Sequence, residues 1–195
     1  MTRIVLVRHA QSAPTPDLPE LAWPLSERGR QQAQDLAAVL AELGVEALAS
    51  SPYVRAIDTL RPFAEAAGLE IQVDPDLRER ELGGWIADVA EVEEAVRRMH
   101  ADPAYHREGG ESAHACLARF DAALARVAAA NAGRCVAVGS HGAILSHFLA
   151  RHLADLPEAF WRRIRNPHLF VFDFTGAPQW EGERTLAGVE GLWPA

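Results

Sequence analysis

The sequence of 195 residues contains no lysine, so all 19 of its basic residues are arginines. Asp and Glu together number 27, and the formal net charge at pH 7 is −8. A chain with this negative balance has no global electrostatic attraction to nucleic acid or to an anionic membrane, and we expect neither as a partner. Arginine binds phosphate oxygens in a bidentate geometry that lysine lacks, which makes the positions of the arginines informative.

Cysteines and long apolar runs are also scarce. The two cysteines, Cys116 and Cys135, have a spacing that fits neither a metal-binding motif nor a disulfide framework, so we expect reduced, buried side chains. No apolar run approaches the roughly 20 residues that span a bilayer. The apolar stretch at residues 1–7 leads directly into Arg8 and His9, unlike a signal peptide, and the sequence therefore predicts a cytoplasmic protein.

The sequence does contain the apolar material of a globular core. Hydrophobic residues make up 49% of the chain and charged residues 24%, and the length predicts a single domain over residues 1–195. Short apolar runs alternate with segments of helical periodicity. The runs predict strands at residues 3–7, 45–49, 69–73, 135–138, 169–174 and 180–186, and the periodic segments predict helices at residues 26–43, 90–99, 112–131 and 143–153.

Capping residues mark where two helices begin. Ser26 is the expected N-cap of the first helix, and Gly44 is its expected terminator. A further helix is expected to start with Ser51 as its N-cap and Pro52 at its first position. Pro62 predicts a kink or a break in that helix.

The alternation of strands and helices is typical of βαβ units. We therefore expect an α/β fold, a three-layer αβα sandwich with a mostly parallel sheet and helices on both faces. Residues 86–110 differ from their surroundings, because the helix predicted there is polar and is followed by Asp102-Pro103 and Gly109-Gly110. We interpret this stretch as a small cap insertion.

Charged and polar side chains follow the predicted strands. In open α/β sheets, ligands bind at the carboxyl ends of the strands. The first strand leads into Arg8 and His9, and another strand ends at His141. Two further strands lead to Arg55 and to Glu79. We expect these side chains to gather on one rim of the sheet.

This set suits phosphoryl transfer without a metal ion or other cofactor. The guanidinium groups of Arg8 and Arg55 can bind the equatorial oxygens of a phosphoryl group. A neutral imidazole is a competent nucleophile toward phosphorus, so one of His9 and His141 would carry the phosphoryl group and the other would stabilise charge. Glu79 can protonate the leaving oxygen and then activate water. The helix start after His141 is expected to add backbone donors for the anion.

Arg8-His9-Ala10 resembles the Arg-His-Gly signature of the histidine phosphatase (phosphoglycerate mutase-like) superfamily. Other landmarks follow in that family's order, over residues 3 to about 150. They are Leu25-Ser26-Glu27-Arg28-Gly29-Arg30-Gln31-Gln32-Ala33, Ser50-Ser51-Pro52-Tyr53-Val54-Arg55-Ala56 with Thr59, Leu77-Arg78-Glu79 with Leu82-Gly83-Gly84-Trp85, Gly110-Glu111-Ser112, and Val138-Gly139-Ser140-His141-Gly142.

The resemblance implies a role for each residue of the rim. It makes His9 the phosphorylated nucleophile and Glu79 the proton donor. Arg8, Arg55 and His141 would line the phosphate pocket. Further candidates for binding the substrate are Ser12, Thr15 and Gly142.

Four residues depart from the family pattern. Ala10 stands where glycine is usual, which the backbone tolerates if the φ angle of that residue is negative. Thr15 stands where the mutases place an asparagine, so either its hydroxyl takes that role or it is an ordinary loop residue. Ile86 and Ala87 replace the usual Glu-Gly pair, which leaves the cap and the substrate undefined.

Several neighbouring residues have competing interpretations. Glu81 lies close to the expected pocket, but Glu79 alone fits the motif register. Arg78 and Arg80 are expected either at the surface or supporting the site from behind, and His147 on a helix surface or partly buried. Residues of the cap either contact the substrate or form a solvated face, and they are His100, Tyr105, His106 and Arg107.

The sequence thus predicts a metal-independent phosphomonoester hydrolase that acts on a small phosphorylated metabolite through a phosphohistidine. A phosphoglycerate mutase is the first alternative. It is disfavoured because a mutase must shield its phosphoenzyme from water, and a chain of 195 residues has little material for a lid. A non-catalytic phosphate-sensing module is the second alternative. The oligomeric state is open, with a homodimer as one option.

Overall fold

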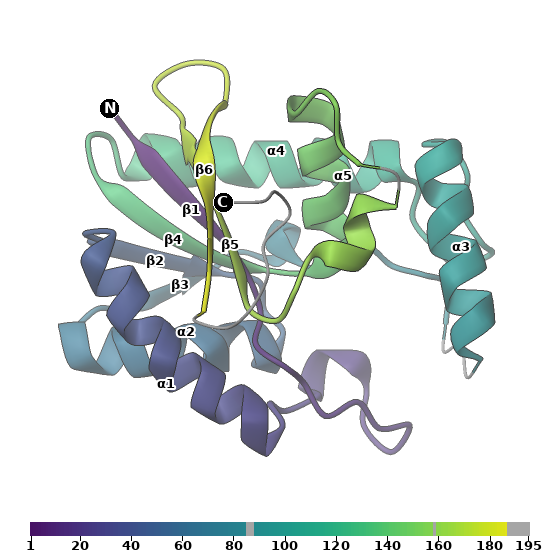
Figure 1. Ribbon diagram of the computed structural model, residues 1–195, viewed down its shortest axis with the longest axis horizontal. Coiled ribbons are helices and arrows are strands. Elements are labelled where there is room, and N and C mark those ends of the chain that lie inside the picture. The colour runs from purple at the N-terminus through teal and green to yellow at the C-terminus, as the bar shows by residue number, and fades with distance from the viewer. Residues whose placement is uncertain (85–87, 158, 187–195) are drawn as a thin grey trace.

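The computed structural model describes residues 1–84, 88–157 and 159–186. Trp85, Ile86 and Ala87, on which part of the family match and the start of the predicted cap depend, lie outside these residues. The chain forms an α/β sandwich around one six-stranded sheet (Figure 1). No helix in the described part is long and apolar enough to cross a membrane.

The strands lie in the order β3-β2-β4-β1-β5-β6. The first four of these strands are parallel, and β5 is antiparallel to both of its neighbours. The prediction of a mostly parallel sheet is confirmed. The strands are β1 (Arg3–Arg8), β2 (Ala47–Ser50), β3 (Ile71–Val73), β4 (Cys135–Ser140), β5 (His168–Asp173) and β6 (Gln179–Thr185).

Helices cover both faces of the sheet, as predicted. In Figure 1, α1 (Glu27–Glu42) and α2 (Val54–Ala67) lie below the sheet, and α4 (Ala113–Ala130) and α5 (Gly142–His152) lie above it. Helix α3 (Val89–Ala101) stands apart from these layers, at the right of the view. Three short 3-10 helices complete the described elements, namely η1 (Glu20–Ala22), η2 (Pro75–Leu77) and η3 (Phe160–Arg163).

The apolar run of the central strand β1 is continuous because both faces of the strand are buried. Ile4 and Leu6 are fully buried in the cluster that includes α4 and α5, whereas Val5 and Val7 are fully buried in the cluster that includes α1 and α2. Successive side chains of a strand point to opposite faces, so a strand covered on both faces is apolar throughout. Cys116 and Cys135 are free and buried, as expected.

Helix α2 differs from its prediction at its start. It begins at Val54, with Tyr53 as its N-cap, because Ser51 lies in the connection from β2. The Ser51 backbone N–H donates to the carbonyl of Gly139 at 2.9 Å, and this bond holds the connection against β4. Pro62 does not break the helix, which continues to Ala67.

Helix α1 begins where the sequence places its cap, and it packs against the loop that follows β1. The hydroxyl of Ser26 accepts a hydrogen bond from the N–H of Gly29 at 3.0 Å. A Cβ atom at Gly29 would lie 1.9 Å from the carbonyl oxygen of Gln11. Glycine is therefore required here, because the backbone of the loop after His9 lies directly against this helix.

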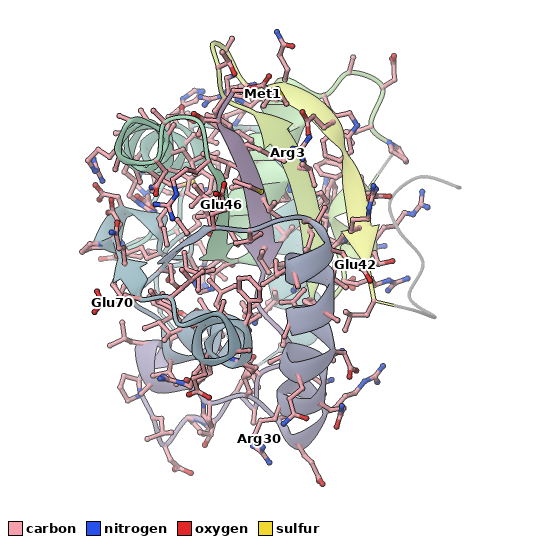
Figure 2. All side chains as sticks on the ribbon, turned by 90° about the vertical axis from the view of Figure 1, so that its left-hand side faces the viewer. Met1, Arg3, Arg30, Glu42, Glu46 and Glu70 are labelled. Atoms are coloured by element: carbon pink, nitrogen blue, oxygen red, sulfur yellow. The ribbon has the colours of Figure 1, made fainter. Side chains whose placement is uncertain are left out.

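Figure 2 shows the end of the molecule where the strands start. Arg3, Glu46 and Glu70 lie there, at or next to the first residues of β1, β2 and β3. The carboxyl ends of these parallel strands are at the opposite end of the sheet, and the predicted site residues follow them there.

Candidate active site

Two histidines from different strand ends meet at the carboxyl edge of the sheet. His9 follows β1, and His141 follows β4 as the N-cap of α5. The centres of their rings are 5.3 Å apart, and the ring of Tyr53 lies 4.8 Å from that of His141. The parallel pairing of β1 with β4 therefore brings together residues that are far apart in sequence.

Hydrogen bonds define the tautomer of His9. Its Nδ1 lies 2.7 Å from the carbonyl oxygen of Ala10, which can only accept, so Nδ1 carries the proton. The lone pair on Nε2 accepts a hydrogen bond from Nε of Arg55 at 3.1 Å. Burial, followed by the charges of Arg55 and Arg8, lowers the pKa of His9 to about 3. His9 is thus a neutral imidazole with an available lone pair at neutral pH.

His141 is completely buried and partly unpaired. Its Nε2 lies 2.6 Å from the hydroxyl of Ser51, and no residue of the described part gives Nδ1 a hydrogen-bond partner. Burial, followed by the neighbouring charges of His9, Arg55 and Arg8, holds the pKa of His141 well below its usual value. The contact with Ser51 was not predicted, although Ser51 belongs to a quoted motif.

Arg8 supplies a second unpaired donor. Its Nη1 donates to the carbonyl of Ile164, while its buried Nε finds no partner within the described ranges. Burial lowers the pKa of Arg8, and the charge of Glu79 opposes this shift. A Cβ atom at Gly142 would lie 3.0 Å from Cζ of Arg8, so glycine at this position leaves room for the guanidinium. Unpaired polar atoms are rare in protein interiors, and this one is positioned to bind an anion.

Arg55 comes from the first turn of α2 and is almost completely buried. Besides His9, it contacts Glu20: Nη1 donates to the backbone carbonyl at 2.8 Å, and Nη2 donates to Oε1 at 2.7 Å. The guanidinium also lies 4.7 Å from the ring centre of Tyr53 and 5.4 Å from that of Trp23. No sequence pattern pointed to Glu20, which is in a proline-rich loop.

Glu79 caps the start of α5. One carboxylate oxygen accepts from the N–H groups of Arg80 at 2.8 Å and Ile144 at 3.0 Å, and the other accepts from Ala143 at 3.1 Å. The sequence predicted free backbone donors for an anion at the start of α5. This prediction is wrong for the N–H groups of Ala143 and Ile144, because Glu79 occupies them. The same bonds fix the carboxylate against the first turn of α5, which follows His141.

A buried arginine that the sequence analysis missed holds the segment carrying Glu79. The guanidinium of Arg119 donates to the backbone carbonyls of Asp76, Arg78 and Glu79, at 2.7, 2.9 and 2.9 Å. It also forms a two-point contact with the carboxylate of Glu111, at 2.8 and 2.7 Å. Glu111 belongs to the quoted Gly-Glu-Ser match, and an acid in that motif is the one signal that could have pointed to a buried partner.

Side chains of two further motifs hold the backbone next to His9. Gln32 accepts from the N–H of Gln11 at 2.9 Å and donates to the carbonyl of Asn166 at 2.6 Å. Asn166 donates in turn to the carbonyl of His9 at 2.7 Å. The hydroxyl of Thr59 accepts from the N–H of Ala10 at 2.9 Å.

The loop residues predicted to bind substrate make contacts within their own loop. Thr15 donates from its hydroxyl to Asp17 at 3.1 Å, and its carbonyl accepts from the indole of Trp23 at 2.9 Å. Ser12 forms a short antiparallel bridge with Leu25. These contacts do not connect Ser12 or Thr15 to His9.

Arg80 and His147 are both buried, which removes the surface interpretation of each residue. Arg80 is 1% exposed, and its guanidinium lies 2.7 Å from Nε2 of His147. The ring of His100 stacks on Trp161 with their centres 4.2 Å apart, and lies 4.6 Å from the ring of His147. His100 therefore ties α3 to the body of the molecule instead of forming a solvated face.

A cavity of about 810 Å³ lies next to Arg55. Glu20 and Trp23 line it, and both contact Arg55. Its other described walls come from the proline-rich loop, the turn after Glu81, α3 and the loop after α3. They are Pro14, Pro16, Leu18, Pro19, Glu81, Leu82, Gly83, Gly84, Val92 and Gly109.

The described residues contain no group of three or more His, Cys, Asp or Glu side chains that could hold a metal ion. Nε of Arg8, a donor left unpaired at the site, fits an oxyanion, and Nδ1 of His141 fits one in the tautomer that carries the proton on Nδ1.

Several known proteins are similar to this chain in sequence. One relative, a bifunctional protein of Mycobacterium tuberculosis, is 33% identical over 156 residues, which cover 72% of this chain but only 41% of that protein. A glucosyl-3-phosphoglycerate phosphatase of the same species is 31% identical over 175 residues, covering 82% of this chain and 78% of that protein. A probable phosphoglycerate mutase of Enterobacter is 30% identical over 189 residues, covering 91% and 87%.

A solved structure is similar as well. The mycobacterial glucosyl-3-phosphoglycerate phosphatase in complex with VO3 superposes with a TM-score of 0.74, at 28% identity, over 92% of this chain and 96% of that chain. The profile of the histidine phosphatase superfamily (branch 1) matches residues 4–181. This chain therefore belongs to the histidine phosphatase superfamily.

Proposed function

We propose that the protein hydrolyses small phosphate monoesters without a metal ion, through a phosphohistidine formed on His9. The observation that carries this proposal is the state of His9, whose proton lies on Nδ1 and whose Nε2 lone pair is held beside Arg55. The unpaired Nε of Arg8 and Nδ1 of His141 supply donors for the phosphoryl oxygens. The phosphatases among the relatives support the same reaction class.

The reaction has two steps. In the first step, Nε2 of His9 attacks phosphorus, the bond from phosphorus to the ester oxygen breaks, and Glu79 in its protonated form gives a proton to the leaving oxygen. In the second step, water attacks phosphorus and gives a proton to Glu79, while the bond to Nε2 breaks and the electron pair returns to the ring. Arg8, Arg55 and His141 stabilise the charge on the oxygens.

Charge and position support these roles. His9 is neutral and needs no base to activate it, because its pKa is lowered to about 3. The carboxylate of Glu79 is tied to the residues that directly follow His141 and Gly142. Thr15, Ser12 and Gly142 remain proposed substrate contacts. Val92 and Gly109, which belong to residues 86–110, line the cavity next to Arg55, so we assign this segment the role of a cap over the leaving group.

The direct test compares hydrolysis with isomerisation. The purified protein is incubated with p-nitrophenyl phosphate and, separately, with 3-phosphoglycerate, and the release of inorganic phosphate and the appearance of 2-phosphoglycerate are followed. We expect phosphate release in the first assay, its loss in His9→Ala, and no net isomerisation in the second. Isomerisation without phosphate release would establish the mutase alternative. No turnover of any phosphoester would establish the phosphate-sensing alternative.

A further inference from the structure

We propose that Glu20 competes with the substrate phosphate for Arg55, and that the enzyme thereby selects esters whose leaving group carries no negative charge. This inference rests on the proposed function, because it concerns the leaving group of the same reaction.

Every nitrogen of the Arg55 guanidinium already has a partner. Nε donates to His9, and Nη1 and Nη2 both donate to Glu20, one to its backbone carbonyl and one to its carboxylate. A phosphoryl group bound to Nε2 of His9 takes the lone pair that Nε of Arg55 now occupies. Arg55 must therefore rearrange when His9 is phosphorylated, and it cannot keep all three present contacts.

The negative charge of Glu20 also requires the contacts of Arg55 to change. A phosphate group next to Arg55 would lie beside the carboxylate of Glu20, which is 2.7 Å from the guanidinium. Two anions that share one guanidinium repel each other, and this repulsion is only partly screened because Arg55 is 4% exposed in its side chain. The carboxylate of Glu20 therefore has to leave Arg55 for the phosphate to bind with full affinity.

Glu20 is placed where it can leave. Its side chain is 44% exposed, and it begins the three-residue helix η1 directly after Pro19. Glu20 also lines the 810 Å³ cavity, which has space for its displaced carboxylate. A displaced carboxylate in that cavity faces the part of the substrate beyond the phosphate.

The cavity is apolar except for acidic groups. Pro14, Pro16, Trp23 and Leu82 contribute apolar surface, and the two charged residues among its described lining are Glu20 and Glu81. The carboxylate of Glu81 lies 3.3 Å from Nε of Arg78, so it is already paired.

Arg107 is not among the described residues that line this cavity. It donates to the carbonyl of Leu82 at 3.5 Å and lines a separate cavity, together with Glu91 and Glu94. A leaving group with a carboxylate would thus meet the unpaired charge of Glu20. A neutral alkyl leaving group would not meet this repulsion. The amine of an amine-bearing leaving group would pair with the carboxylate of Glu20.

Three esters of similar size test this selectivity. They are 2-aminoethyl phosphate, propyl phosphate and phosphoglycolate, whose leaving groups carry a positive, a neutral and a negative end. For the wild type we expect kcat/KM to be at least about tenfold lower for phosphoglycolate than for propyl phosphate, the size of effect that one close charge contact produces. We expect aminoethyl phosphate to equal or exceed propyl phosphate.

Glu20→Gln is the decisive variant, and Glu42→Gln is its control. Glu42 is an exposed carboxylate at the end of α1, at the far end of the molecule (Figure 2). Glu20→Gln should bind inorganic phosphate about tenfold more tightly by calorimetry and should hydrolyse the three esters at nearly equal rates. Glu20→Asp keeps the charge but cannot reach Arg55 equally well, so it should tighten phosphate binding while keeping part of the selectivity. Glu42→Gln should match the wild type in both assays.

Either of two results would overturn the inference. One is a Glu20→Gln variant with the phosphate affinity of the wild type, and the other is an unchanged ratio between propyl phosphate and phosphoglycolate. A failure of the proposed function looks different, because the wild type would then release phosphate from none of these esters. The calorimetric comparison of phosphate binding would still decide whether Glu20 competes for Arg55.

Discussion

Replacing Arg119 tests how the fold positions Glu79. Arg119 touches neither His9 nor the phosphate pocket in any contact described above, yet it binds three carbonyls of the segment that carries Glu79 and pairs with Glu111. Its side chain is 10% exposed and that of Glu111 is 14% exposed. Arg119→Gln should therefore leave a largely buried carboxylate without its partner.

The size of the effect follows from these contacts. Breaking a buried ion pair costs about 3–5 kcal/mol, and the partial exposure of this pair places the expected loss in unfolding free energy at about 3 kcal/mol. For a chain of this length, such a loss lowers Tm by about 6–12 °C. Replacing both partners, as in Arg119→Met with Glu111→Leu, should cost less than Arg119→Gln alone, because no unpaired charge remains.

The assay separates a positioning role from a merely structural one. Without Arg119, the carboxyl of Glu79 should no longer be held next to the leaving oxygen. Hydrolysis of an alkyl phosphate, whose leaving group needs a proton, should then lose about 100-fold in kcat. Hydrolysis of p-nitrophenyl phosphate, whose leaving group departs as an anion, should lose less than about tenfold. The double variant should recover stability without recovering kcat on the alkyl ester.

Arg126→Gln is the matched control. Arg126 lies on the same helix and binds the carboxylates of Asp74 and Asp76, but its side chain is 52% exposed. An exposed, solvent-screened pair of this kind contributes little to stability, so this variant should resemble the wild type in both assays. An equal loss of kcat on both esters in Arg119→Gln, or the same loss in Arg126→Gln, would refute the positioning role.

Three further predictions follow from the buried histidines, the Arg8 pocket and the proposed chemistry. The pKa is lowered to about 3 in His9 and His147 and to about 4 in His100, so below pH 6.5 the unfolded chain binds protons that the folded chain does not. Unfolding free energy should therefore fall by about 1.4 kcal/mol per pH unit for each of these histidines between pH 6 and pH 4, and equal urea midpoints at pH 7 and pH 5 would contradict this. Gly142→Ala would place a Cβ 3.0 Å from Cζ of Arg8, so kcat/KM should drop about tenfold with a loss of about 1–2 kcal/mol in stability, and unchanged kinetics would show that the pocket can adjust. Prolonged dialysis against EDTA should leave phosphate release unchanged, whereas a loss that Mg²⁺ or Zn²⁺ restores would rule out the metal-independent reaction.

The layers of the fold are readable in the sequence because each element obeys a local rule. The alternation of Ile4, Val5, Leu6 and Val7 between two helical layers requires a continuous apolar run, and Ser26 and Gly29 mark the start of α1. The start of α2 could not be read in this way. Ser51 has the pattern of an N-cap, but its hydroxyl lies against His141, a contact between residues 90 positions apart.

The site also has a part that the sequence predicts and a part that it does not. His9, Arg55, Glu79 and His141 follow strand ends, and a parallel sheet brings such positions together by its topology alone. The contacts of Glu20 with Arg55 and of Arg119 with the segment around Glu79 depend on how loops fold back on the site. No spacing in the sequence encodes these contacts, so only the structure reveals them.

Capture of the phosphoenzyme tests the central claim most directly. The protein is mixed with p-nitrophenyl phosphate labelled on phosphorus, whose leaving group needs no proton from Glu79. The reaction is quenched in alkali within the first turnovers and digested, and the labelled peptide is then identified. We predict an acid-labile, alkali-stable label on the peptide that contains His9, present in Glu79→Gln and absent in His9→Ala. A label on the peptide that contains His141, or one that persists in His9→Ala, would contradict the account.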